Sequence, residues 1–167
     1  IIAFDKNRET LALATQESII DVACSSIDDN FANCDYIFLC APVAYNTAYL
    51  KQLKNYVSGD CILTDVGSVK TSIHEEIIAL DMEANFIGGH PMAGSEKSGF
   101  ANSKAHLIEN AYYILTPSAK VSQNKLDKYY EFVESLKALP VKLSYEEHDY
   151  ITGVISHLPH IIASTLV

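Results

Sequence analysis

The stretch YIFLCAPVAYNTAYLKQLKNYVSGDCILTDVGSVK, residues 36–70, decides the fold class. It opens with a continuous apolar run at residues 36–40, which is typical of a strand buried on both faces of a sheet. Pro42 follows where a helix can begin, because the first turn of a helix does not use the missing N–H. A second apolar run at residues 61–64 leads into another helix over about residues 69–80. Strands that are each followed by a helix predict parallel pairing with right-handed crossovers.

The same alternation continues on both sides of this stretch. Residues 1–4 predict a strand and residues 7–15 a helix, and Ser122 is placed to cap a later helix. Further short strands are predicted at residues 86–87, 111–116 and 141–143. We therefore predict an α/β domain built on a doubly wound parallel sheet, with ligands bound beyond the carboxyl ends of the strands. Because the chain opens inside a strand pattern, we expect the first strand of the sheet and its Gly-rich turn to lie outside this sequence.

The last helix starts with a capping box, in which Ser144 is followed three residues later by Glu147. Apolar residues then recur at helical spacing: Ile151, Val154, Ile155, Leu158, Ile161, Ile162 and Leu166. Such a stripe predicts packing against further protein. We expect residues 1–144 to form the α/β domain and residues 145–167 to begin a second, helical domain. Pro159 lacks a backbone N–H, so we expect a local distortion of this helix.

Charge and composition exclude several classes of partner. The chain has 21 acidic and 12 basic residues, a formal net charge of −9, which argues against nucleic acid as a partner. No apolar run approaches the roughly 18 residues that span a bilayer, so we predict no membrane partner. The four cysteines show no C-x-x-C spacing, and Cys40 and Cys61 fall in apolar runs that suit buried, reduced thiols. We predict a cytoplasmic setting.

Two strand ends offer candidate cofactor contacts. Asp5 follows the first strand, where an acidic residue in a dinucleotide-binding fold accepts hydrogen bonds from ribose hydroxyls and disfavours a 2′-phosphate. Asp5 equally suits the start of the next helix. The small residues after the central strand allow close packing of a flat nicotinamide or ribose, or simply form a strand-to-helix turn; they are Cys40, Ala41, Pro42 and Val43.

The segment from Asp65 to Lys70 is more specific. Gly67 permits a tight turn, Ser68 offers a hydroxyl at a helix start, and Lys70 is expected one turn inside that helix. Ser68 suits a helix cap as well as a substrate contact, and the two roles are compatible. The spacing of a phosphate-binding P-loop is absent.

The richest segment runs from Gly88 to Gly99 and holds four of the seven glycines of the chain. That density predicts a backbone that bends sharply or lets a ligand approach closely. His90, Ser95 and Glu96 are polar groups in this segment, beyond a strand end. A lone histidine is more often structural than catalytic, but this position favours a functional role for His90.

The remaining histidines give weaker signals. His157 and His160 are spaced i and i+3, so both rings project from one face of the last helix. No third ligand shares that spacing, and we predict no metal site. For His74, His106 and His148 we expect positions on the surface.

Three motifs, in order and spacing, resemble prephenate dehydrogenases: residues 65–70 (DVGSVK), 88–99 (GGHPMAGSEKSG) and 156–160 (SHLPH). The resemblance covers essentially the whole chain. It implies NAD-dependent oxidative decarboxylation of prephenate to 4-hydroxyphenylpyruvate in tyrosine biosynthesis. It also implies a Rossmann domain paired with a helical domain that forms a homodimer.

The resemblance also implies roles for individual residues. His90 corresponds to the catalytic histidine that accepts a hydrogen bond from the ring hydroxyl of the substrate, and Ser68 to a serine that orients both groups. Positions implied on the substrate side are Ser95, Glu96, His157 and His160. Positions implied on the cofactor side are Asp5, Cys40, Ala41, Pro42, Val43, Asp65 and Gly67. The arginine with which the family holds a substrate carboxylate is not in this sequence, so we expect this chain alone to be inactive.

Three other readings stay open at this point. An arogenate or dual-specificity dehydrogenase would carry the same motifs. A module that senses dinucleotide without catalysis would not need the Ser68 and His90 pair. A β-hydroxyacid dehydrogenase would need a lysine where this chain offers a histidine.

Overall fold

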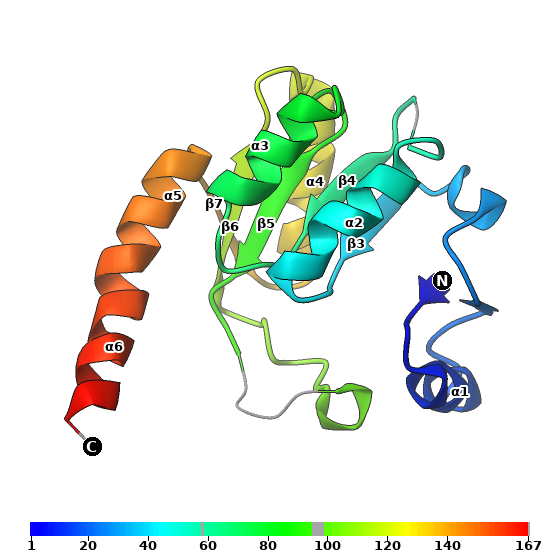
Figure 1. Ribbon diagram of the computed structural model, residues 1–167, viewed down its shortest axis with the longest axis horizontal. Helices are drawn as coiled ribbons and strands as arrows, with labels where there is room; N and C mark the ends of the chain where they lie inside the picture. The colour runs from blue at the N-terminus through cyan, green and yellow to red at the C-terminus, as the bar shows by residue number, and fades with distance from the viewer. Residues whose placement is uncertain (58, 95–98, 167) are drawn as a thin grey trace.

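The computed structural model describes residues 1–57, 59–94 and 99–166, apart from the side chains of His157 and His160 (Figure 1). Its strands are β1 Ile2–Phe4, β2 Val22–Cys24, β3 Tyr36–Leu39, β4 Ile62–Asp65, β5 Ile87–Pro91, β6 Tyr112–Pro117 and β7 Leu139–Lys142. Its α-helices are α1 Arg8–Gln16, α2 Val43–Leu53, α3 Thr71–Ala79, α4 Gln123–Ser135, α5 Tyr145–Thr152 and α6 Leu158–Thr165. Short 3₁₀ turns lie at Asp29–Phe31 and Phe100–Asn102, and a π-helical turn at Gly153–His157 joins α5 to α6.

Strand pairing confirms the α/β class and corrects one detail. β1 pairs with β2, β3 with β4, and β6 with β7, all in parallel. A parallel bridge from Leu63 to Phe86 continues the sheet from β4 toward β5. β5 and β6, however, run antiparallel, with Ile87 opposite Pro117 and Pro91 opposite Tyr113. The prediction of a parallel sheet was wrong for this pair: the described residues between the two strands contain a 3₁₀ turn and no α-helix, whereas a parallel pair needs a crossover connection, usually an α-helix.

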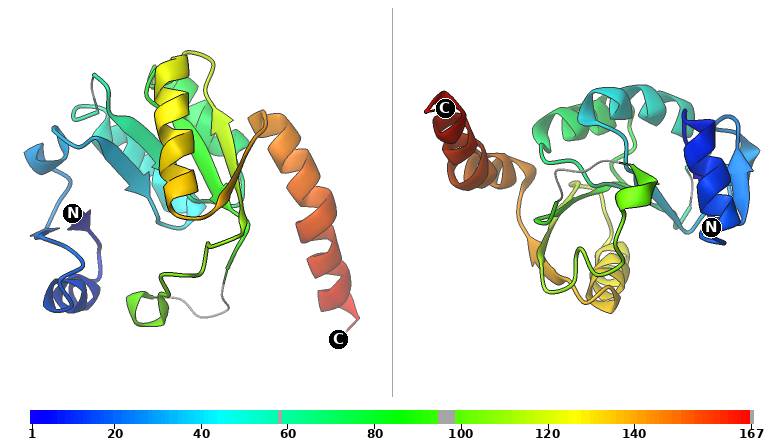
Figure 2. Two further views of the ribbon diagram at one scale, coloured as in Figure 1. Left: turned by 180° about the vertical axis from the view of Figure 1, so that it is seen from behind. Right: turned by 90° about the horizontal axis from the view of Figure 1, so that it is seen from below.

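Helices cover both faces of the sheet, as the doubly wound prediction requires. Figures 1 and 2 show α2 and α3 on one face and α4 on the other. Neighbouring residues of β4 point to opposite faces, as in any strand. Leu63 packs in the core that contains Leu50 and Ile77, whereas Ile62 packs in the core that contains Tyr129. The β3–β4–β5 region is therefore packed on both faces by apolar cores, and these cores fix the positions of the strand ends.

Local sequence signals predicted most of the helix starts correctly. Ser122 caps α4, and Ser144 and Glu147 form the predicted capping box at the start of α5. The π-helical turn just before Pro159 is the predicted distortion, since proline cannot donate to the helix ladder. α3 begins at Thr71 rather than near residue 69, and Lys70 rather than Ser68 holds its N-cap position.

Beyond the sheet, the chain ends in a helical arm. α5 lies beside the sheet and α6 extends away from the body of the molecule (Figure 1). The side chains of Ile155 and Ile161 are 61% and 59% exposed. Within the described residues, no helix is both long and apolar enough to cross a membrane.

Candidate active site

A buried ion pair supports the loop that follows β4. The Lys70 ammonium contacts the Asp65 carboxylate, and both residues are fully shielded from solvent. Lys70 also donates to the carbonyl oxygen of Gly89 at 2.8 Å. The Asp65 carboxylate accepts from the backbone N–H groups of Gly67 at 2.9 Å and Gly89 at 3.3 Å. This pair ties the end of β4 to the middle of β5.

Gly89 has to be glycine because of this close approach. A Cβ at Gly89 would lie 2.6 Å from the carbonyl oxygen of Asp65 and 2.9 Å from the Tyr113 ring. Contacts this short are not tolerated between a side chain and backbone. The glycine density that the sequence shows is thus explained at this position by packing between neighbouring strands. It brings His90, the next residue, to the carboxyl edge of the sheet beside the β4 loop.

His90 lies on β5 and is partly exposed. Its Nδ1 is 2.8 Å from Nε2 of His148, and the two rings meet at 67° with centroids 5.0 Å apart. His148 comes from α5 and is fully buried. Burial is the main cause that lowers the pKa of His148 below its usual value, and it outweighs the opposing effect of Asp149. His148 is therefore neutral at neutral pH.

Asp149 holds the other side of the His148 ring. Its Oδ1 is 2.7 Å from Nδ1 of His148. The same carboxylate accepts from the backbone N–H groups of Lys70 and Thr71, both at 2.8 Å, and from the Thr71 hydroxyl at 2.6 Å. Burial acts to raise the pKa of Asp149, but the bonds from Thr71, Lys70 and His148 together hold it below its usual value. Asp149 is thus an ionised cap for the N-terminus of α3, supplied by α5.

The predicted cofactor-side residues lie at or after the carboxyl ends of β1, β3 and β4. Asp5 is exposed and its carboxylate accepts from the N–H of Asn7 at 2.7 Å. The end of β1 packs on α2, with the Phe4 ring 5.9 Å from the Tyr49 ring and the Lys6 ammonium 4.9 Å from the Tyr45 ring centre. α2 begins at Val43, the last residue of the segment Cys40 to Val43, without a side-chain cap at Pro42.

Gly67 lets the loop that follows β4 pack closely against the segment Cys40 to Val43. A Cβ at Gly67 would meet the Asp65 carboxylate at 2.9 Å and the Val43 side chain at 3.0 Å. Ser68 is exposed on the same loop. Among the described contacts, no hydrogen bond joins Ser68 to His90, and the ring of His90 is instead held by His148.

Several predicted positions are corrected by the structure. Asp65 is fully buried in its ion pair, and its cofactor-side role stays a prediction. Lys70 is not one turn inside α3 but at its start. His74 and His148 are not surface residues, because both side chains are buried. Cys40 is exposed, although Cys61 is buried as expected, and all four cysteines are free thiols.

The predicted substrate-side residues lie wholly or in part outside the described structure. Ser95 and Glu96 lie outside the described residues. His157 and His160 lie in the π-helical turn and α6, and their side chains are outside the description. His106 is exposed, as expected.

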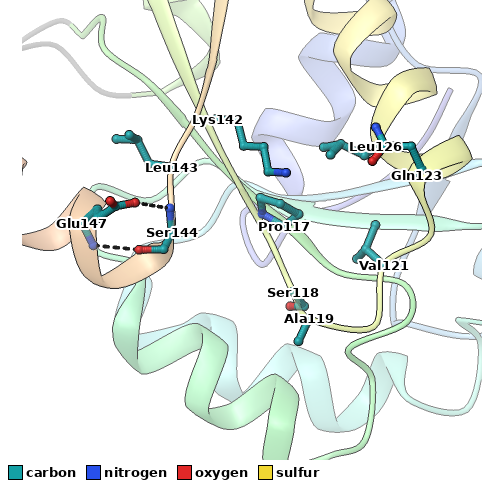
Figure 3. Close-up of a pocket in the computed structure, with 10 residues that line it drawn as sticks. All are labelled: Pro117, Ser118, Ala119, Val121, Gln123, Leu126, Lys142, Leu143, Ser144 and Glu147. Carbon is teal, nitrogen blue, oxygen red and sulfur yellow. Dashed lines mark hydrogen bonds between the residues drawn. The ribbon is translucent and has the colours of Figure 1, made fainter.

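A hollow of about 450 Å³ is separate from the cluster formed by His90, His148 and Asp149 (Figure 3). Pro117 and Ser118 line it from the end of β6, and the capping box of Ser144 and Glu147 closes one side. Pro117 pairs with Ile87, at the start of β5, whereas His90 is near the end of that strand. The hollow therefore lies at the opposite edge of the sheet from His90.

The fold and the cluster define a class: an α/β domain of the dinucleotide-binding type, with a partly exposed histidine held by a second histidine and a carboxylate. Comparison with known families makes the assignment specific. The model described as "Prephenate dehydrogenase, nucleotide-binding domain" matches residues 1–142, and "Prephenate dehydrogenase, dimerization domain" matches residues 144–167. The chain belongs to the prephenate dehydrogenase family.

Individual relatives agree with this assignment. A prephenate dehydrogenase from Bacillus subtilis is 36% identical over 169 residues, covering 100% of this chain and 46% of the relative. The crystal structure of prephenate dehydrogenase from A. aeolicus in complex with hydroxyphenyl propionate and NAD+ superimposes with a TM-score of 0.90 at 35% identity, covering 98% of this chain and 57% of that one. Synechocystis arogenate dehydrogenase gives a TM-score of 0.90 at 31% identity, with coverage of 99% and 58%. This chain spans about half the length of these relatives.

Proposed function

We propose that this chain is part of an NAD-dependent prephenate dehydrogenase, with His90 as the group that accepts the proton of the ring hydroxyl of the substrate. The observation that carries the proposal is the position of His90 at the carboxyl edge of the sheet, where its Nδ1 is held by His148. Residues 1–144 supply the nucleotide-binding part in this account. Residues 145–167 begin the helical part.

The described residues fit a nicotinamide dinucleotide. Asp5 presents an exposed carboxylate that suits ribose hydroxyls and opposes a 2′-phosphate, which favours NAD. Cys40, Ala41, Pro42 and Val43 present small groups at the uncapped start of α2, and Gly67 keeps the neighbouring loop close. NAD, when bound, supplies the acceptor for a hydride. These residues bind and orient it next to the loop that carries Ser68.

Proton handling falls to the residues of the cluster. In oxidative decarboxylation of prephenate to 4-hydroxyphenylpyruvate, the ring hydroxyl becomes acidic as its carbon is oxidised. A neutral imidazole is suited to accept that proton at neutral pH. Carbon dioxide then leaves with its bond electrons returned to the ring, which becomes aromatic. Beyond positioning, the protein has to supply only this proton transfer.

Other roles follow from the family motifs. Ser68 is exposed on the loop that follows β4 and is proposed to contact the same hydroxyl. Ser95, Glu96, His157 and His160 are proposed to contact the side chain of the substrate or to control its access. The exposed apolar residues of α5 and α6 are proposed to pack against the rest of a helical domain that forms a homodimer. Four free thiols suit a reducing, cytoplasmic setting.

Arogenate is the second candidate substrate. The similarity to Synechocystis arogenate dehydrogenase, at a TM-score of 0.90, supports it as much as the similarity to prephenate dehydrogenases of known structure supports prephenate. Both substrates carry the same ring hydroxyl, so the proposed role of His90 is common to the two.

Formation of NADH by the full-length protein tests the proposal directly. Absorbance at the NADH band is followed with prephenate and with arogenate, using NAD and NADP in parallel. We expect NAD-dependent turnover with a higher kcat/KM for prephenate. Turnover with arogenate alone would replace the substrate, and a protein that binds NAD but oxidises neither compound would overturn the proposal in favour of a sensing module.

A further inference from the structure

We propose that His148 and Asp149 are positioning residues that fix the tautomer of His90, with the proton on Nδ1 and the accepting lone pair on Nε2. This inference rests on the function proposed above for His90. It concerns residues that the sequence motifs do not single out. The contacts Asp149–His148 and His148–His90 form one continuous chain of hydrogen bonds from the start of α3 to the carboxyl edge of β5.

Asp149 decides which groups donate and which accept along this chain of hydrogen bonds. Its carboxylate is ionised at neutral pH, because hydrogen bonds from Thr71 and Lys70 hold its pKa below the usual value against the effect of burial. An ionised carboxylate can only accept hydrogen bonds. The 2.7 Å contact therefore requires that Nδ1 of His148 carries a proton and donates it.

The state of His148 follows from its burial. The ring is fully buried and its pKa is lowered, mainly by that burial, so the neutral form with a single proton dominates at neutral pH. Since the proton sits on Nδ1, Nε2 of His148 carries the lone pair. At 2.8 Å from Nδ1 of His90, this nitrogen can only accept, and His90 must donate. Neutral His90 is then protonated on Nδ1, which leaves Nε2 as the proton acceptor.

The same chain stabilises the charged form of His90. Uptake of a proton at Nε2 creates an imidazolium whose Nδ1–H points through His148 to the negative charge of Asp149. Among the residues that the structure describes, Lys70 and Asp65 are ionisable groups near His90, and they contact the preceding residue Gly89 and neutralise each other. Tyr113 of β6 lies against Gly89 with its pKa raised to about 12, mainly by burial, so it is neutral.

Asp149→Asn keeps part of the capping role and reverses the contact with His148. With its oxygen in the place of Oδ2, asparagine still accepts from the N–H and hydroxyl of Thr71. Its amide nitrogen then takes the place of Oδ1, presents N–H to His148 and gives up the bond from the Lys70 N–H. His148 would have to accept at Nδ1 and donate from Nε2, which reverses the tautomer of His90. We expect kcat to fall by a factor on the order of 10²–10⁴ while KM changes far less. The acidic limb of the kcat/KM profile should move to lower pH, because the imidazolium loses its carboxylate.

Two variants of His148 test the middle of the chain. Phenylalanine fills the space but forms neither hydrogen bond, whereas glutamine can accept from His90 and donate to Asp149. We expect His148→Gln to turn over faster than His148→Phe, by a factor of about ten. Ser144→Ala serves as the control for loss of helix stability, because the hydroxyl that it removes accepts from the N–H of Glu147 and leaves the contacts of the His148 and Asp149 side chains in place.

The decisive readout is ¹⁵N NMR of the histidine rings in the full-length protein without substrate. We expect a protonated Nδ1 and an unprotonated Nε2 for His90 in the wild type, and the opposite in Asp149→Asn. A wild-type ring protonated on Nε2, or variants of His148 and Asp149 within about twofold of wild-type kcat, would overturn the inference. The NMR result does not depend on the reaction. If His90→Asn keeps wild-type turnover, the proposed function fails, whatever the tautomer.

Discussion

At the scale of single residues, the ion pair of Asp65 and Lys70 is the least replaceable feature near the site. Both side chains are fully buried, and burial lowers the pKa of Lys70 despite the neighbouring carboxylate. Breaking such a pair leaves one charge without a partner, which costs far more than the pair itself contributes. The sequence showed both residues within one motif but gave no signal that the two side chains face each other.

Lys70→Met is expected to lower the free energy of unfolding by about 3–5 kcal/mol, because Asp65 would remain buried without a counter-charge. Urea denaturation of the full-length protein measures the change. The matched control is Lys51→Met, which removes the surface pair of Lys51 with Glu76 and is expected to cost about 0–1 kcal/mol. Similar losses for the two variants would contradict the account of the buried pair.

His74 predicts a dependence of stability on pH. Burial, with a further contribution from the charge of Lys70, lowers its pKa to about 4, while Ser118 and Thr116 contact its two ring nitrogens. The unfolded chain, with an ordinary histidine pKa near 6.5, binds the proton first. The stabilisation is therefore complete above about pH 6.5 and is lost as the pH falls toward 4, by roughly 3 kcal/mol.

Urea denaturation of wild type and His74→Gln at a series of pH values between 7.5 and 4.5 measures this contribution. The glutamine variant does not titrate, so we expect its free energy of unfolding to fall less steeply with acid. Parallel curves for the two proteins would show that His74 has no such role.

At the scale of elements, the sequence predicted where helices begin better than it predicted the contacts between elements. Caps at Ser122 and Ser144 are set by neighbouring residues and were predicted correctly. The antiparallel β5–β6 pair and the cap of α3 by Asp149 depend on residues far apart in the chain. His148 and Asp149 carry no spacing motif, so their contact with the β5 edge could not be found from the sequence. His90, by contrast, was marked by the glycines around it and by its place just beyond the strand predicted at residues 86–87. The structure extends that strand to Pro91, so His90 lies inside it.

The capping box gives a prediction for α5. Ser144→Ala removes the hydroxyl that accepts from the N–H of Glu147 at 3.2 Å. We expect a loss of about 1 kcal/mol in the free energy of unfolding, measured by thermal or urea denaturation. Ser135→Ala, at the C-terminal end of α4, removes a hydroxyl that donates to the nearby carbonyl oxygen of Phe132 and is the control with a smaller expected effect. A loss at Ser144 no larger than at Ser135 would count against the box.

At the scale of the whole molecule, the helical arm formed by α5 and α6 is the feature that indicates contact with further protein. α6 extends from the body (Figure 2), and its apolar residues Leu158, Ile161 and Ile162 are half exposed or more. In a longer protein of this family, we expect further helices to cover them. Ile161→Asp should then lower the free energy of unfolding of the full-length protein by about 2–4 kcal/mol. Asn124→Asp on the exposed face of α4 is the control, and equal, small effects would mean that the stripe stays in solvent.

The central claim is that His90 accepts the substrate proton, and the kinetics of His90→Asn in the full-length protein test it most directly. With prephenate and NAD, we expect kcat to fall by a factor on the order of 10²–10⁴ while KM changes little, because the lost interaction belongs to the transition state. His106→Asn, at an exposed histidine, is the matched control and should behave as wild type. A His90→Asn variant with the kcat of wild type would contradict the account.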